Sequence, residues 1–199
     1  MIKYNSKGII IALLIAFIII LGSFNFLLHS TSFHGSLIKK YSDNTNHLDI
    51  DRNVTRYITG LDSKLNVDFN EDERLHMLDV KRLVLIEEFL FISLLIGFFV
   101  LIYKRKILLN HFKKVSLIVF LIALFSLIAS LFFDSFFELF HIILFPQGNW
   151  QFNAGSLMIQ VYQQSFFQGF FVRTILAAVF ISLFLTIFLY LIVVKNRKI

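Results

Sequence analysis

Four apolar runs constrain this chain more than any other feature of its sequence. They cover residues 8–28, 83–103, 115–133 and 174–194. A helix rises about 1.5 Å per residue, so about 20 residues cross a hydrocarbon layer of roughly 30 Å. Backbone groups in lipid must bond within the segment, which favours helices over strands. The sequence therefore predicts an all-α polytopic membrane protein with four transmembrane helices in a single membrane domain, residues 1–199.

The first run raises the alternative of a secretory signal peptide, because Lys3 and Lys7 precede it. Signal peptides have an apolar core of about 7–15 residues and a cleavage site of the A-x-A type. This run is longer, and no such site follows it. We therefore expect an uncleaved first transmembrane helix.

Lysine and arginine indicate the orientation of the four spans. Residues 1–7, 104–114 and 195–199 carry basic side chains and no acid. The positive-inside rule places both termini in the cytoplasm. The outer segments 29–82 and 134–173 then face outward, where we expect them to form a small extracellular cap. The net charge of +6 mostly reflects this bias and does not indicate a nucleic-acid partner.

Outer segment 29–82 contains several helix signals. In one, Val54, Tyr57 and Ile58 follow helical spacing and Gly60 is a stop signal. In another, Asn70 and Glu73 form a capping box, which predicts a helix that runs through His76 directly into the second span. Residues 31–41 are compatible with either a short helix or a strand.

Two histidines lie beside carboxylates near the ends of apolar runs. His76 and Asp79 are three residues apart on the predicted helix, so Asp79 can accept a hydrogen bond from one ring nitrogen. Asp134, Glu138 and His141 are spaced i, i+4, i+7 and share a helix face. Ionisable groups at membrane depth often mark functional cavities. The alternatives are an exposed His–Asp pair and a polar stripe that faces lipid headgroups.

Two imidazoles suit general base and general acid catalysis near neutral pH. Asp79 and Glu138 are candidates to orient them, and no serine occurs in a G-x-S-x-G or S-x-x-K pattern. Acyl chemistry would then proceed by direct attack of a substrate group. The chain has no cysteine, which excludes thiol catalysis and Cys-ligated zinc. His76, His141 and a carboxylate leave a metal site open as an alternative, but no close ligand spacing supports one.

The elements ERLHMLDVKRL before the second span and FHIILFPQGNWQF after the third together resemble the lipoprotein intramolecular transacylase family of Gram-positive bacteria. The resemblance extends over nearly the whole chain, including the VTRYI helix and the aromatic pair Phe166-Phe167. One departure is Tyr162-Gln163-Gln164, where family members commonly have Pro-Glu after the aromatic residue. A structural role that a Gln amide also fulfils would explain this change.

The resemblance implies an enzyme that uses no cofactor and no metal. It would act on diacylglyceryl-modified lipoproteins in the outer leaflet of the bacterial cytoplasmic membrane, among membrane lipids and with its active site at the extracellular face. It would move the sn-2 acyl chain to the α-amino group of the modified cysteine. The family histidines correspond to His76 and His141, and its amide-and-tryptophan loop to Gly148, Asn149 and Trp150.

A developing oxyanion requires hydrogen-bond donors, for which Asn149, the loop N–H groups and Arg173 are candidates. Asp134 is a further candidate supporting residue. Two other functions remain open at this point. One is a membrane hydrolase or metalloenzyme that uses the same histidines, and the other is a four-helix membrane scaffold without catalysis.

Overall fold

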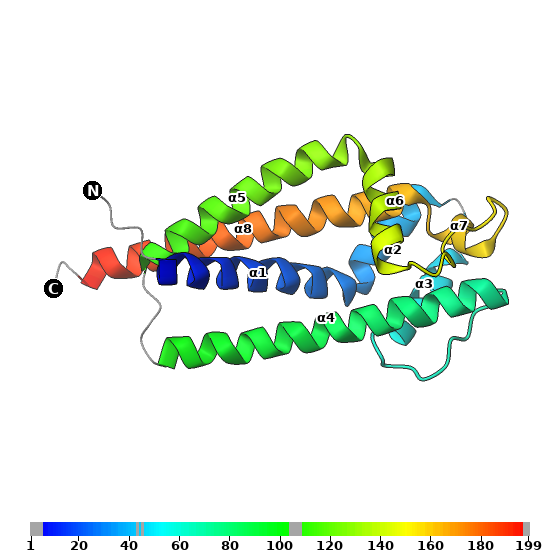
Figure 1. Ribbon diagram of the computed structural model, residues 1–199, viewed down its shortest axis with the longest axis horizontal. Coiled ribbons are helices and arrows are strands. Elements are labelled where there is room, and N and C mark those ends of the chain that lie inside the picture. The colour runs from blue at the N-terminus through cyan, green and yellow to red at the C-terminus, as the bar shows by residue number, and fades with distance from the viewer. Residues whose placement is uncertain (1–5, 43, 45, 104–108, 197–199) are drawn as a thin grey trace. The chain divides into compact units, whose positions relative to one another are not determined.

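The computed structural model describes residues 6–42, 44, 46–103 and 109–196 (Figure 1). The helices are, in chain order, α1 (Ser6–Leu28), α2 (Thr31–Tyr41), α3 (His47–Ile58), α4 (Glu71–Tyr103), α5 (Leu109–Ser130), α6 (Phe133–Leu144), α7 (Leu157–Val161) and α8 (Gln164–Asn196). Helix makes up 81% of the described residues, and no strand occurs among them. The all-α prediction is confirmed. Thr31–Tyr41, for which the sequence allowed either a helix or a strand, is a helix.

Four helices are long and apolar enough to cross a membrane. Among the described residues they contain the segments Gly8–Leu28, Glu71–Tyr103, Phe112–Ser130 and Gln164–Leu191. None of the residues in the most apolar window of α4 is buried inside the protein. Side chains this apolar and this exposed suit contact with lipid rather than water.

The third and fourth of these helices differ from their predicted limits. The third apolar run was predicted to continue to residue 133. Instead, α5 ends at Ser130, a turn follows, and α6 begins at Phe133 as a separate helix. Helix α8 begins at Gln164, well before the predicted start of the fourth span at Thr174.

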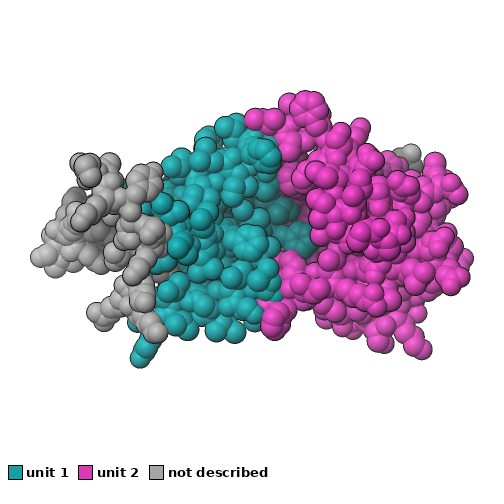
Figure 2. All heavy atoms as spheres, viewed as in Figure 1, with its two compact units in different colours: residues 1–24, 90–127, 173–199 teal, residues 25–89, 128–172 magenta. Residues whose placement is uncertain are grey.

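The chain divides into two compact units, and their boundaries fall inside helices (Figure 2). Unit 1 comprises residues 1–24, 90–127 and 173–199. Its buried core combines three alanines with larger apolar side chains, and its members are Ala12, Ile15, Ala16, Ile19, Phe112, Val115, Val119 and Ala178. Small residues let helix backbones approach closely, which is how helices pack where no hydrophobic effect drives association.

Polar contacts between α5 and α8 support the packing of unit 1. The hydroxyl of Ser116 donates to the carbonyl of Ser182 at 3.0 Å and lies 2.6 Å from the hydroxyl of Thr186. The two hydroxyl side chains, Ser116 and Thr186, occur on helices that are otherwise strongly apolar. Hydroxyls of this kind satisfy one another across a helix interface without adding charge to a membrane segment.

Unit 2 comprises residues 25–89 and 128–172 and contains all the short helices (Figure 1). Helix α3 buries Val54, Tyr57 and Ile58, as their helical spacing predicted. Gly60 has a φ of 75°, a conformation that glycine adopts without steric cost. The predicted stop at this glycine is confirmed, because α3 ends at Ile58.

A buried carboxylate joins three segments of unit 2. Oδ1 of Asp51 on α3 lies 3.0 Å from Nδ1 of His34 on α2 and accepts a hydrogen bond of 3.1 Å from the hydroxyl of Tyr162, which follows α7. Burial, together with the neighbouring Asp51 charge, raises the pKa of Tyr162 well above its ordinary value. The phenol therefore stays protonated and donates to the carboxylate. Asp51 thus cross-links α2, α3 and the end of α7.

Candidate active site

The capping box at the start of α4 positions His76. The Asn70 N–H donates to Oε2 of Glu73 at 2.8 Å, and the Glu73 N–H donates to Oδ1 of Asn70 at 3.0 Å, so the sequence prediction is confirmed. The other carboxylate oxygen of Glu73 accepts the Met158 N–H at 2.9 Å. Glu73 is only 2% exposed. The turn of α4 that precedes His76 is therefore held by both its own cap and the segment that begins α7.

His141 lies in the last turn of α6 and is buried. Its Nδ1 is 2.7 Å from the backbone carbonyl of Phe137. A carbonyl accepts hydrogen bonds only, so Nδ1 carries the proton, and Nε2 of the neutral ring has a free lone pair. Burial lowers the pKa of His141, although the Phe137 carbonyl opposes this shift. His141 is consequently a neutral imidazole with Nε2 as its basic atom.

The structure places the two predicted histidines side by side within unit 2. Their ring centroids are 6.1 Å apart, and the ring planes differ by 24°. His76 comes from α4 and His141 from α6, far apart in the sequence. Nδ1 of His76 is buried and has no hydrogen-bond partner among the described residues. A buried polar atom without a partner costs about 1–3 kcal/mol, which a bound ligand can recover.

Aromatic rings surround the histidine pair. Phe145 contacts both imidazoles, with centroids 4.7 Å from His76 and 5.5 Å from His141. Trp150 lies 4.9 Å from His141, and Phe152 lies 5.6 Å from His76. Trp150 was predicted as a site residue. The phenylalanines were not, because this chain contains 26 of them and nothing in the sequence distinguishes these two.

A turn after α6 brings the amide loop onto α4. Pro146 is in the second position of the turn, which suits its fixed φ, and the Gly148 N–H donates to the Phe145 carbonyl at 3.0 Å. Gly148 has a φ of 80°. Nε2 of Gln147 and Nδ2 of Asn149 then both donate to Oδ2 of Asp79 at 2.9 Å.

Asp79 holds this loop rather than an imidazole. Its Oδ2 is engaged by the two amides, and its Oδ1 accepts from Arg82 at 3.0 Å. The expected hydrogen bond from His76 to Asp79 does not occur among the described contacts, in keeping with the unpartnered Nδ1 of His76. Asp79 therefore supports the site through Gln147 and Asn149. Gln147 was missed by sequence reasoning, although it stands in the same PQGN turn as Asn149.

The two carboxylates of α6 do not orient His141 either. Asp134 accepts from Nε2 of Gln164 at 2.8 Å, and Glu138 is exposed. The atom that holds the ring is the Phe137 carbonyl, because an imidazole on a helix can reach the carbonyl four residues earlier. Asp134, Glu138 and His141 have the predicted spacing, but only His141 is covered by Phe145 and Trp150. Arg173 belongs to unit 1, so its role as an oxyanion donor stays a prediction.

No group of three or more His, Cys, Asp or Glu side chains suited to a metal ion occurs in the described part of the chain. The site instead combines two imidazoles, an aromatic enclosure and an amide loop held by a carboxylate. Donors and a basic nitrogen inside an apolar enclosure suit proton transfer on a substrate that is itself largely apolar.

The fold and the site define a class: an all-helical protein with four helices able to cross a membrane and a buried pair of histidines. Comparison with known families identifies the group within that class. The model of the lipoprotein intramolecular transacylase Lit family matches residues 8–167, so the chain belongs to this family. This membership supports acyl transfer on lipoproteins. No curated protein and no solved structure shows significant similarity to the chain.

Proposed function

We propose that this protein moves the sn-2 acyl chain of an S-diacylglyceryl cysteine to the α-amino group of the same cysteine. The product is a lipoprotein with an N-acyl, S-monoacylglyceryl terminus. The observation that carries the proposal is the pair of imidazoles, 6.1 Å apart inside an aromatic enclosure, in a chain of the Lit family. Such a substrate carries its amine and its ester on one molecule, which gives the reaction a high effective concentration.

His141 is the proposed base. The α-amine has an ordinary pKa of about 8 and attacks only when it is neutral. The Phe137 carbonyl binds the Nδ1 proton of His141, so Nε2 faces the reaction with a lone pair. As the amine nitrogen bonds to the ester carbonyl carbon, Nε2 takes one proton from the nitrogen.

His76 is the proposed proton donor to the leaving group. When the tetrahedral intermediate collapses, the bond between the carbonyl carbon and the sn-2 oxygen breaks, and that oxygen receives a proton from His76. The proton that His141 took from the nitrogen then passes to His76, so both imidazoles return to their starting state. One N–C bond forms, one C–O bond breaks, and the proton lost by nitrogen is balanced by the proton gained by oxygen. The unpartnered Nδ1 of His76 supports a role in which this ring completes its hydrogen bonds with substrate.

Asn149 and the N–H groups of its loop are the proposed donors to the oxyanion. Asp79 holds this loop at Gln147 and Asn149, so these donors are positioned before substrate binds. Trp150 and the surrounding phenylalanines are proposed to accommodate the acyl chain. The basic residues near both chain ends and in residues 104–114 support a location of unit 2 on the outer side of the membrane, by the positive-inside rule.

Mass spectrometry of lipoprotein N-terminal peptides tests the function directly. Cells that express the protein should convert the diacylglyceryl form to the lyso form, and cells without it should not. Lipid attachment that is the same in both would reject the proposal. Release of free fatty acid instead of transfer would indicate a hydrolase at the same histidines.

A further inference from the structure

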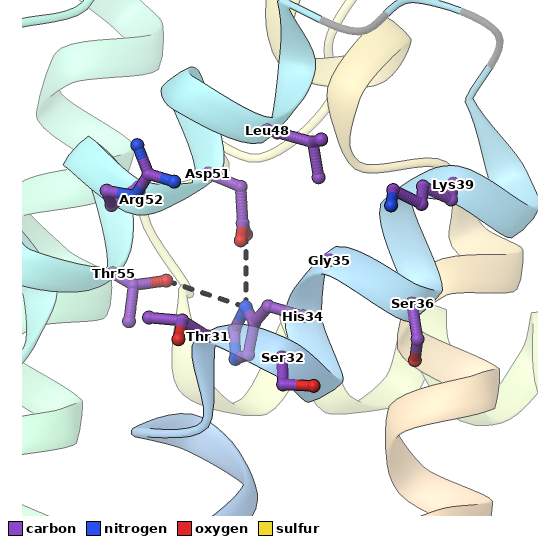
Figure 3. Close-up of a pocket in the computed structure, with 10 residues that line it drawn as sticks. All are labelled: Thr31, Ser32, His34, Gly35, Ser36, Lys39, Leu48, Asp51, Arg52 and Thr55. Carbon is purple, nitrogen blue, oxygen red and sulfur yellow. Dashed lines mark hydrogen bonds and ion pairs between the residues drawn. The ribbon is translucent and has the colours of Figure 1, made fainter.

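A cavity lies between α2 and α3, and none of the residues that line it belongs to the histidine pair (Figure 3). Its volume is about 430 Å³, which is enough for a small polar headgroup. Most of the exposed lining surface is apolar, but most of the lining residues have polar side chains, among them Thr31, Ser32 and Thr55. All the residues that line it belong to unit 2.

The buried imidazole of His34 is part of this lining. The residue is only 5% exposed, and its Nε2 has no hydrogen-bond partner among the described residues. Its Nδ1 faces Asp51, which can only accept, so Nδ1 carries a proton. Figure 3 shows the second ring nitrogen turned away from Asp51, on the side of Thr31 and Ser32. Nε2 therefore lies away from the open centre, and His34 borders the cavity with the edge of its ring that faces Asp51.

The charges around the cavity favour an anion. Lys39 and Arg52 line opposite sides, and Figure 3 shows the Lys39 ammonium turned toward the open centre. Arg52 also contacts the exposed Asp49 at 2.8 Å. The one lining carboxylate, Asp51, is already engaged by His34 and by the hydroxyl of Tyr162. Two cations therefore line a cavity whose one carboxylate already accepts hydrogen bonds from within the protein.

The start of α2 adds a further attraction for an anion. Thr31 and Ser32 form the first turn of this 11-residue helix, which Ser30 caps by accepting the Phe33 N–H at 3.3 Å. The N–H groups of a first turn and the helix dipole favour negative charge, and phosphate groups bind at such places.

The position in the chain indicates where that anion would come from. The first candidate span ends at Leu28, and α2 begins only a few residues later at Thr31. A chain that leaves a hydrocarbon core at Leu28 has its next turn at the depth of the lipid phosphates. The first turn of α2 would therefore meet phospholipid headgroups.

We propose that this cavity binds the phosphate group of an anionic phospholipid, between Lys39, Arg52 and the first turn of α2. The site is independent of the acyl transfer assigned to His76 and His141. It gives the cap a specific lipid ligand beside its membrane helix.

The test measures binding of two probes to the full-length protein. Inorganic phosphate is added to the detergent-purified protein, and phosphatidylglycerol is supplied in nanodiscs against a phosphatidylcholine background. The test variant is Lys39→Gln. The matched control is Lys40→Gln, because Lys40 is the adjacent residue and its ammonium lies over the Tyr41 ring rather than in the cavity lining.

We expect saturable binding of phosphatidylglycerol that is weakened at least fivefold by Lys39→Gln and unchanged by Lys40→Gln. Binding of inorganic phosphate alone, with the same dependence on Lys39, would support the anion site and assign it to free phosphate. No saturable binding of either probe, or an equal response of the two lysine variants, would overturn the proposal. Neither result depends on transacylase activity.

Discussion

Two histidines of unit 2 are buried to similar degrees but have different partners. Nδ1 of His34 faces the Asp51 carboxylate at 3.0 Å, whereas Nδ1 of His141 faces the Phe137 carbonyl at 2.7 Å. A carboxylate can form an ion pair with a protonated ring. A neutral carbonyl fixes the tautomer but supplies no charge. Burial alone therefore does not distinguish the two histidines. The hydrogen-bond partner of Nδ1 distinguishes a histidine suited to linking helices from one suited to proton transfer.

The largest effect should come from removing the proposed base. His141→Gln keeps the size and polarity of the side chain but has no basic nitrogen. We expect conversion to the lyso form to slow by about 100- to 10,000-fold, the usual contribution of general base catalysis. The rate is measured by mass spectrometry on a synthetic diacylglyceryl lipopeptide.

The control for this variant is His29→Gln, because His29 is a largely exposed histidine of the same unit. It should leave the rate unchanged. If His141→Gln retained the wild-type rate, the contrast between the two buried histidines would have no catalytic meaning.

The contact between His34 and Asp51 predicts an effect on stability. Asp51→Ala removes the acceptor shared by His34 and Tyr162, which leaves the buried Tyr162 hydroxyl without this partner and Nδ1 of His34 with only a 3.5 Å contact to the Thr55 hydroxyl. We expect a loss of about 2–4 kcal/mol in the free energy of unfolding, seen as a lower Tm in detergent. Asp49→Ala is the control, because Asp49 forms only an exposed pair with Arg52. Equal Tm values for the two variants would contradict a cross-linking role for Asp51.

The pH profile sharpens the proposed role of His141. Burial lowers the pKa of this ring below its ordinary value of 6.5, so the base is unprotonated throughout the neutral range. We expect the rate to rise with pH toward about 8, as the substrate amine loses its proton. Acidification through the lowered pKa should then reduce the rate about tenfold further per pH unit. A pH profile in which the base is already protonated above pH 7 would contradict a pKa of His141 that burial lowers.

The smallest effect concerns the amide loop. Gly148 has a φ of 80°, and a Cβ added there would meet no atom within 4 Å. Gly148→Ala therefore reports backbone strain alone, which costs about 1–2 kcal/mol. We expect a rate several-fold lower, because the loop holds Asn149. Gly155→Ala is the control, since that glycine has the same open space without the positive φ, and a similar loss in both variants would indicate general loop sensitivity.

Local patterns carried most of the information that sequence reasoning recovered. The Asn70–Glu73 capping box predicted the start of α4 and both of its hydrogen bonds. The stop at Gly60 and the apolar spans are equally local, because length, spacing and glycine chemistry determine them. His76 and His141 were recognised from their positions beside apolar runs, and the family resemblance connected them.

Contacts through the backbone and between distant segments were not predictable in the same way. Every residue offers a carbonyl, so nothing in the sequence marked Phe137 as the partner of His141. The link from Asp51 to His34 and Tyr162 depends on how α2, α3 and α7 pack. The role of Asp79 as a supporting residue stays a prediction, and its amide partners lie about 70 residues away in the chain.

The loop between α6 and α7 is fastened to α4 at two points. Asp79 holds its beginning through Gln147 and Asn149, and Glu73 holds its end through the Met158 N–H. The intervening residues, which include Trp150, can therefore move only as a loop that is anchored at both ends. Substrate exchange that displaced Trp150 would move the middle of this loop outward while both contacts with α4 stay in place. Residues inserted near the middle would lengthen the loop and leave both contacts intact.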